Sequence, residues 1–287
     1  MGMKVDDRQL HHLRFADDIV LITLGISQAE RILTEFDETC GCIGLQLNLD
    51  KTMFMRIGWA SDAPFTVNGT NISQCTSYVY LGRELNMMND LTPELGRRRR
   101  AAWRAYKSIE DVVKKTRNTR LRAHLFNTTV LPALTCASET WVFRMQEENS
   151  VSIIERTIER VMLGVSRFPQ VRDDIRSSLL RQRSKIRDAA AFAEESKIRW
   201  AGHVMHFNDN RWTRAVSDWV PRDIKRTTGR PPTRWSDFFT KSFKEKYDAL
   251  RVPRKRGNYW ATLARDREKW KNYWRPLDQF EDQRESR

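Results

Sequence analysis

The sequence predicts an α+β fold for its first third and an all-α fold for the rest. Before residue 95, short apolar segments alternate with polar residues between turn-forming residues, which is typical of strands. After Gly96, apolar residues recur every three or four positions, which is typical of helices with one buried face. The charge changes at the same place: residues 1–95 carry a net −6 and residues 96–287 a net +20. We therefore predict three regions, at 1–95, 96–171 and 172–287.

The first predicted element is a strand, a turn and a second strand around two adjacent aspartates. Leu13 and Phe15 precede Asp17 and Asp18, and an apolar run at 19–22 follows them. Adjacent like charges are unfavourable unless something neutralises them, and Mg²⁺ prefers carboxylate oxygens. The pattern favours a Mg²⁺ (or Mn²⁺) site at the hairpin tip, with a solvated Asp-Asp turn as the alternative.

A helix is predicted next, because Ser27 and Glu30 have the spacing of a capping box. Gly44 is placed to end it. Its apolar face comprises Ala29, Ile32, Leu33, Phe36, Cys40 and Ile43.

Alternating residues then predict short strands at 45–49, 53–57, 65–67 and 78–81. The Asn-Gly pair at 68–69 predicts a turn between two of them. The first region is therefore predicted to be rich in strands.

Helices dominate the predicted second region. One covers the basic stretch 97–115, a second begins near Leu121 and stops near Pro132, and a third follows the stripe 151–165 and is closed by Pro169. Beyond residue 172, Pro and Gly punctuation predicts short helices joined by loops. Seven of the ten Trp residues fall there, and we expect most of them to pack in the core rather than to stack on bases.

The composition narrows the class of protein. Apolar content of 40% argues against a disordered chain. No apolar run is long enough to span a bilayer, so no membrane partner is expected. Four Cys in 287 residues and the absence of a secretory signal favour an intracellular protein, in the nucleus or cytoplasm. No Cys/His motif has the spacing of a zinc site.

Six short motifs resemble, in their order, the later part of reverse transcriptases of non-LTR (LINE-type) retrotransposons. An aromatic-Ala-Asp-Asp hairpin comes first, followed by two further palm motifs and three C-terminal motifs. They read RFADDIVL (14–21), GLQLNLDKT (44–52), YLG (80–82), SETW (138–141), IRWAGHV (198–204) and GRPPTRW (229–235).

This resemblance implies roles for particular residues. Asp17 and Asp18 would bind the catalytic metal, and Phe15 would lie near the nucleotide or the primer end. Lys51 would lie near the incoming triphosphate, although a solvated lysine is the alternative. The primer-grip hairpin, or else an ordinary turn, would be formed by Tyr80, Leu81 and Gly82.

The resemblance also implies that the catalytic set is incomplete. A polymerase palm needs a further Asp on an earlier strand, and fingers that bind template and nucleotide, whereas twelve residues precede Leu13. Asp6 and Asp7 stand in a polar context unlike a buried strand. We expect weak or absent metal binding and no polymerase activity from this chain alone. Palm, fingers and endonuclease segments would have to come from elsewhere, and dNTP would bind only in a complete enzyme.

The basic half predicts a polyanionic partner, and the resemblance implies that this partner is an RNA template and a DNA primer. By resemblance, the stretch after Gly96 is the thumb, and its Arg side chains suit phosphate. A solvated helix face is the alternative. The candidate contacts are Arg97, Arg98, Arg100, Arg104, Lys107 and Lys114, with Arg230 and Arg234 in the C-terminal region.

Three hypotheses remain from the sequence. The chain is the C-terminal part of an RNA-directed DNA polymerase, or a non-catalytic protein that binds nucleic acid through its basic half, or a remnant that does not fold alone.

Overall fold

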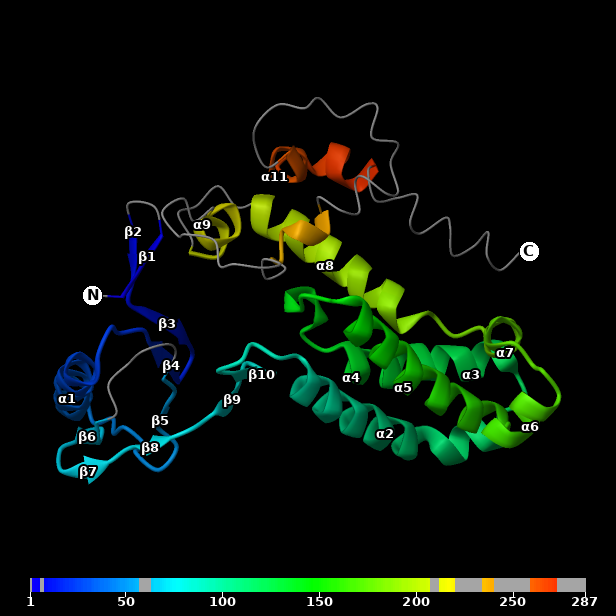
Figure 1. Cartoon of the computed structure of the whole chain (residues 1–287), viewed down its shortest axis with the longest axis horizontal. Helices are drawn as coiled ribbons and strands as arrows, with labels where there is room; N and C mark the ends of the chain where they lie inside the picture. The colour runs from blue at the N-terminus through cyan, green and yellow to red at the C-terminus, as the bar shows by residue number, and fades with distance from the viewer. Residues whose placement is uncertain are drawn as a thin grey trace. The chain divides into compact units, whose positions relative to one another are not determined.

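The computed structural model is described here for residues 2–5, 8–56, 63–206, 212–219, 234–239 and 259–272. The chain divides into two units (Figure 1). The first unit comprises residues 1–90 and 210–225, and the second comprises 91–209 and 226–287. Short sheets in the first unit and helices in the second confirm the α+β class.

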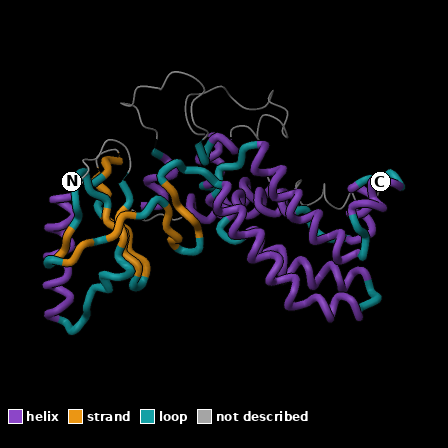
Figure 2. Tube along the Cα trace, turned by 60° about the horizontal axis from the view of Figure 1, so that its bottom comes forward, coloured by secondary structure: helices purple, strands orange, loops and turns teal. Residues whose placement is uncertain are grey.

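Strands of the first unit pair two at a time in the described residues, and Figure 2 shows them as short segments joined by loops. Four pairs are antiparallel and one is parallel, β5 with β8. The pairs are β1 (Met3–Val5) with β2 (Arg8–Leu10), β3 (His12–Phe15) with β4 (Asp18–Leu21), β5 (Met53–Phe54) with β8 (Ser73–Gln74), β6 (Thr66–Val67) with β7 (Thr70–Asn71), and β9 (Ser77–Tyr80) with β10 (Arg83–Asn86).

Two predicted turns are confirmed. The two-residue loop between β3 and β4 has a positive φ of 50° at Ala16. Asn68 and Gly69 join β6 to β7 with φ of 49° and 77°. Positive φ at such positions matches the twist of the paired strands, and Asn and Gly tolerate it. The pair β1–β2 was not predicted; Val5 and Leu10 are buried in it, whereas Asp6 and Asp7 lie outside the described residues.

The helix α1 (Ile26–Cys42) begins differently from the prediction. Gly25 is its N-cap, with no side-chain cap, and the Leu24 amide donates to Oε1 of Gln28 at 3.2 Å. The Ser27–Glu30 capping box is therefore wrong. Glu30 instead accepts from the Thr66 amide at 2.9 Å, because β6 lies against this helix. The predicted end is confirmed: Gly44 has φ +76° and Leu45 bonds back to Cys40.

The predicted strand at 45–49 is wrong, since these residues form no strand. The Asn48 carbonyl accepts from the Thr52 amide at 3.0 Å, so the chain turns where a strand would extend. Leu45 is 58% exposed. A small core of Phe65, Val67 and Ile72 packs nearby, against apolar residues of α1.

The second unit is helical. Its elements are α2 (Thr92–Lys115), α3 (Thr119–Leu125), the π-helical η1 (Phe126–Val130), α4 (Leu131–Thr135), the 3₁₀ turn η2 (Ser138–Thr140), α5 (Met145–Leu163), α6 (Arg167–Arg172), α7 (Ser177–Ser184), α8 (Ala189–His206) and α11 (Tyr259–Ala264). The helix α9 (Trp212–Asp218) falls in the first unit. None of the described helices is long and apolar enough to cross a membrane.

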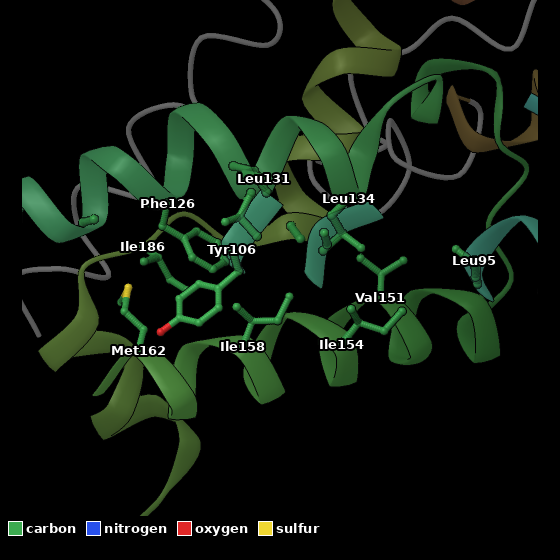
Figure 3. Close-up of a cluster of buried hydrophobic side chains, with 14 of the residues drawn as sticks. Leu95, Tyr106, Phe126, Leu131, Leu134, Val151, Ile154, Ile158, Met162 and Ile186 are labelled. Atoms are coloured by element: carbon green, nitrogen blue, oxygen red, sulfur yellow. The ribbon is translucent and has the colours of Figure 1, made fainter. Parts of the chain in front are cut away.

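The main core confirms that the predicted helices at 97–115 and 151–165 each bury one apolar face, as α2 and α5. Figure 3 shows Tyr106 of α2 facing Ile158 and Met162 of α5. Phe126 and Leu131 close the cluster from the other side and are fully buried. Two members of the predicted stripe differ, since Val161 is 43% exposed and Val165 lies beyond the end of α5.

Neither predicted proline stop is correct. The chain passes Pro132 through η1 into α4, where Pro132 occupies the first turn. A proline lacks the N–H that a regular α-helix needs at this position, and the wider π-helical turn η1 directly before it changes the hydrogen-bonding pattern there. The helix α5 ends at Gly164, with φ +68°, and Pro169 lies inside α6.

Helices on the two sides of residue 171 pack together. The helix α8 packs on α4 and α5, and α7 packs on α3 and α5. A second cluster joins α8 to Phe239, Trp260 and Trp270, all of them buried. Residues 172–206 thus share a core with residues 91–171.

Candidate functional site

The aspartate hairpin presents polar and aromatic side chains to solvent. Phe15 pairs opposite Asp18 across β3 and β4, and Asp17 lies in the connecting turn. Both carboxylates are exposed, and Phe15 is 61% exposed. The hairpin is therefore formed as predicted, with its functional groups at the surface.

Tyr80 belongs to a second hairpin whose tip is Leu81 and Gly82. These two residues have φ of 47° and 82° between β9 and β10. Burial raises the pKa of the Tyr80 hydroxyl, and the nearby Asp18 carboxylate raises it further because a negative neighbour disfavours the phenolate. The structure therefore brings together Asp18 and Tyr80, which come from two of the predicted motifs.

Lys51 lies in the turn after α1. Its side chain is exposed, and its amide donates to Oδ1 of Asn48 at 3.0 Å. Within the described residues, no hydrogen bond or ion pair joins Lys51 to Asp17 or Asp18.

The aspartates do not make up a two-metal set. Within the part of the chain that the structure describes, no group of three His, Cys, Asp or Glu side chains could hold a metal ion. Two-metal catalysis relies on carboxylates that clamp both ions in a closed site. Two exposed carboxylates at a turn do not fit that requirement.

A basic face runs along α2. At about 100° per residue, its four cations fall within an arc of about 80°, opposite the buried face of the helix. All four side chains are exposed. The buried face holds Ala102, Tyr106 and Val113. We define the basic face of α2 as Arg100, Arg104, Lys107 and Lys114.

Two predicted contacts lie off this face. Glu94 is fully buried, and Oε1 accepts from Nε of Arg98 at 2.6 Å. Arg97 donates to the same carboxylate at 2.9 and 3.0 Å. Arg98 is only 6% exposed. The prediction of a phosphate contact at Arg98 is therefore corrected: its guanidinium neutralises a buried acid.

Two carboxylates share this side of α2. Exposed Asp111 lies within the arc of the four cations, at about 20° from Arg100, and Glu110 lies beside that arc. Glu110 lies 2.9 Å from Nζ of Lys114 and 3.6 Å from Nζ of Lys107. Its hydrogen bond to Lys114 is the main reason that the pKa of Glu110 is lowered. Arg100 and Arg104 have no acidic partner among the described residues, so they are the cations of this face most available to phosphate.

Comparisons with known proteins relate part of the chain to reverse transcriptases and most of it to a transposon-derived protein. Residues 3–85 match the reverse transcriptase (RNA-dependent DNA polymerase) family, a span that begins before the aspartate hairpin and ends within β10. The chain is 36% identical over 274 residues to a transposon-derived protein of Caenorhabditis elegans. The matched region covers 93% of this chain and 96% of that protein. The chain belongs to this transposon-derived family. No solved structure matches it.

The reverse-transcriptase-related region thus contains Asp17, Asp18 and Tyr80, whereas the basic face of α2 lies beyond it. Of the two C-terminal candidates, Arg234 is exposed next to a turn in which its amide donates to Asp237 at 2.7 Å. Arg230 lies outside the described residues.

Sequence reasoning missed two features of this transposon-derived protein. One is buried Glu94, although its spacing of three and four residues from Arg97 and Arg98 is the usual signal of a helical ion pair. The other is the guanidinium of Arg8, 4.2 Å from the ring centre of Trp212. No local signal could reveal that contact, because its partners lie about two hundred residues apart.

Proposed function

We propose that the chain derives from the RNA-directed DNA polymerase of a non-LTR, LINE-type retrotransposon and binds RNA template and DNA primer without polymerising on its own. The observation that carries this proposal is the basic face of α2. Four exposed cations follow one side of a 24-residue helix, while its opposite side is anchored in the core.

Such an arrangement suits a phosphate backbone. The helix spans roughly 36 Å at 1.5 Å per residue, and its buried side keeps the cations on a rigid support. Phosphates neutralised by Arg and Lys release condensed counterions, so affinity falls steeply with salt. The +20 charge of residues 96–287 adds long-range attraction for any polyanion.

Polymerase activity is a separate question, and the exposed aspartates argue against it. The comparison with reverse transcriptases supports descent from a polymerase, while the carboxylates of the described residues do not form a two-metal set. A primed RNA template, the full chain, dNTPs and either Mg²⁺ or Mn²⁺ provide the test. We expect incorporation no higher than in the same reaction with Asp17→Asn. Incorporation that depends on Asp17 would show an active polymerase.

Binding is tested with a labelled RNA–DNA duplex over a range of salt concentrations. For the full chain, the logarithm of affinity should fall linearly with the logarithm of salt concentration. Replacing Arg100, Arg104 and Lys107 together by Gln should reduce that slope by about 2 to 3. A matched control replaces three exposed cations elsewhere in the second unit: Arg167, Arg172 and Arg176. A slope unchanged in the α2 variant, or changed equally in the control, would contradict the proposal.

A further inference from the structure

The helix α8 carries an exposed aromatic pair that the basic face does not explain. Trp200 is 38% exposed, and among the described tryptophans it is the one with an exposed side chain. Its ring centre lies 5.7 Å from that of His203, with the ring planes inclined by 37°. Both rings therefore reach the surface side by side.

The rest of α8 is committed to packing. Ala201, Val204 and Met205 are buried, and at about 100° per residue they face away from the exposed arc. That arc spans roughly 100° and contains Arg199, Trp200 and His203, with the imidazole between the other two. The arc is held rigidly, because Trp270 Nε1 donates to the Ile198 carbonyl at 3.0 Å.

A cation completes this arc. The Arg199 side chain is 61% exposed, and its ion pair with Glu195 is long, at 3.9 Å. Glu195 has a closer partner in Arg187, at 2.8 Å. The guanidinium of Arg199 is therefore not committed to Glu195 and can reach an anion.

A single exposed tryptophan is unremarkable in a folded protein. An exposed indole beside an imidazole and an exposed guanidinium is a different feature, since aromatic faces stack on bases and Arg contacts phosphate. Paired bases in a duplex are stacked on each other and offer no free face, so an unpaired base is the ligand that this chemistry fits.

We propose that Trp200 and His203 form a stacking platform for one unpaired base of a single strand, with Arg199 contacting the adjacent phosphate. The proposal rests on nucleic-acid binding as the function of the chain, and it adds a site for single strands separate from the basic face of α2.

The test compares affinities of the full chain for a labelled single strand and for a blunt duplex. Trp200→Ala should weaken single-strand binding about 5- to 150-fold and leave the salt slope unchanged, because stacking releases no counterions. Duplex binding should stay the same. Trp200→Phe keeps an aromatic face and should lose much less. Phe168→Ala, which removes an exposed aromatic from α6, should have no effect.

A second measurement avoids dependence on the folding of the Ala variant. A 5-iodouridine strand irradiated with the unaltered chain should crosslink within the peptide that contains Trp200. Equal single-strand affinity of Trp200→Ala and the unaltered chain, or crosslinks elsewhere only, would overturn the platform. If the unaltered chain binds neither single strand nor duplex, the proposed function fails as well. If the unaltered chain binds duplex normally but Trp200→Ala does not change single-strand affinity, only the stacking platform is refuted and the proposed function stands.

Discussion

Nε of Arg98 lies 2.6 Å from Oε1 of Glu94, and the Glu94 side chain is fully buried at the start of α2. Two residues further along the same helix, Arg100 is exposed. A run of four identical residues thus contains cations with opposite tasks. Arg98 neutralises a buried acid in the core, whereas Arg100 faces solvent on the basic face.

This difference predicts opposite effects of the same substitution. Arg98→Gln should destabilise the second unit by about 3 kcal/mol, because it removes one of the positive charges that neutralise the buried Glu94 carboxylate. Arg100→Gln should change stability by less than about 0.5 kcal/mol but should weaken duplex binding. Urea denaturation and salt-titrated binding measure the two effects. Equal stability losses in both variants would contradict the assignment.

Weak metal binding is predicted for the aspartate hairpin. Two exposed carboxylates leave most of the coordination shell to water, so we expect no saturable Mn²⁺ binding tighter than about 1 mM. Proton relaxation enhancement during a Mn²⁺ titration provides the measurement, with Asp17→Asn as the matched control. Micromolar binding that disappears in Asp17→Asn would show a preformed site.

Glu155 predicts a dependence of stability on pH. This carboxylate of α5 is fully buried, and it accepts from Arg181 at 3.0 Å and from the Ala189 amide at 3.1 Å. Burial raises its pKa to about 7 despite the opposing effect of Arg181, and Asp188 adds to the rise.

Because the folded-state pKa exceeds the ordinary value of 4.5, the stability due to this group is complete below the unfolded pKa and is lost as pH rises through about 7. The urea concentration at the unfolding midpoint should therefore increase as the pH is lowered from about 8 to about 6. In Glu155→Gln this gain should shrink, since Gln does not titrate. A gain as large in Glu155→Gln as in the unaltered chain would contradict the prediction.

Replacing a helical glycine by alanine should have opposite effects on stability at Gly202 and at Gly96, because only Gly202 is closely packed. A Cβ on Gly202 would lie 2.5 Å from Cδ1 of buried Trp270, whose hydrogen bond to Ile198 holds the ring in place. Gly202→Ala should therefore destabilise by about 1 to 3 kcal/mol. A Cβ on Gly96 of α2 would meet nothing nearer than Arg100 at 3.8 Å, so Gly96→Ala should stabilise by about 0.5 to 1 kcal/mol. Differential scanning calorimetry of both variants checks the signs.

Local patterns predicted the elements whose causes are local. The hairpin around Asp17 and the turn at 68–69 formed because backbone twist and permissive residues act over a few positions. The stripes of α2 and α5 were predictable for the same reason, since an apolar residue every three or four positions defines a buried side before any partner is known.

One prediction failed because a distant residue competed for the same group, and another failed because an unusual helical turn formed nearby. Glu30 was expected to cap its own helix. Its carboxylate instead accepts a hydrogen bond from the amide of Thr66, which lies 36 residues further along the chain. Pro132 was expected to stop a helix, but the π-helical turn η1 precedes it and the helical backbone continues through Pro132 into α4. The contact between Glu30 and Thr66 leaves no mark in the sequence around either residue.

The sequence by itself determined the reverse-transcriptase-related hairpins, the amphipathic helices and the concentration of positive charge after residue 96. Tertiary structure alone decided which Arg is buried against Glu94, which Trp reaches the surface and which carboxylates stand together. The physical reason is that periodicity gives each helix an inside and an outside, whereas the exposure of a given side chain depends on the neighbours that the fold brings to it.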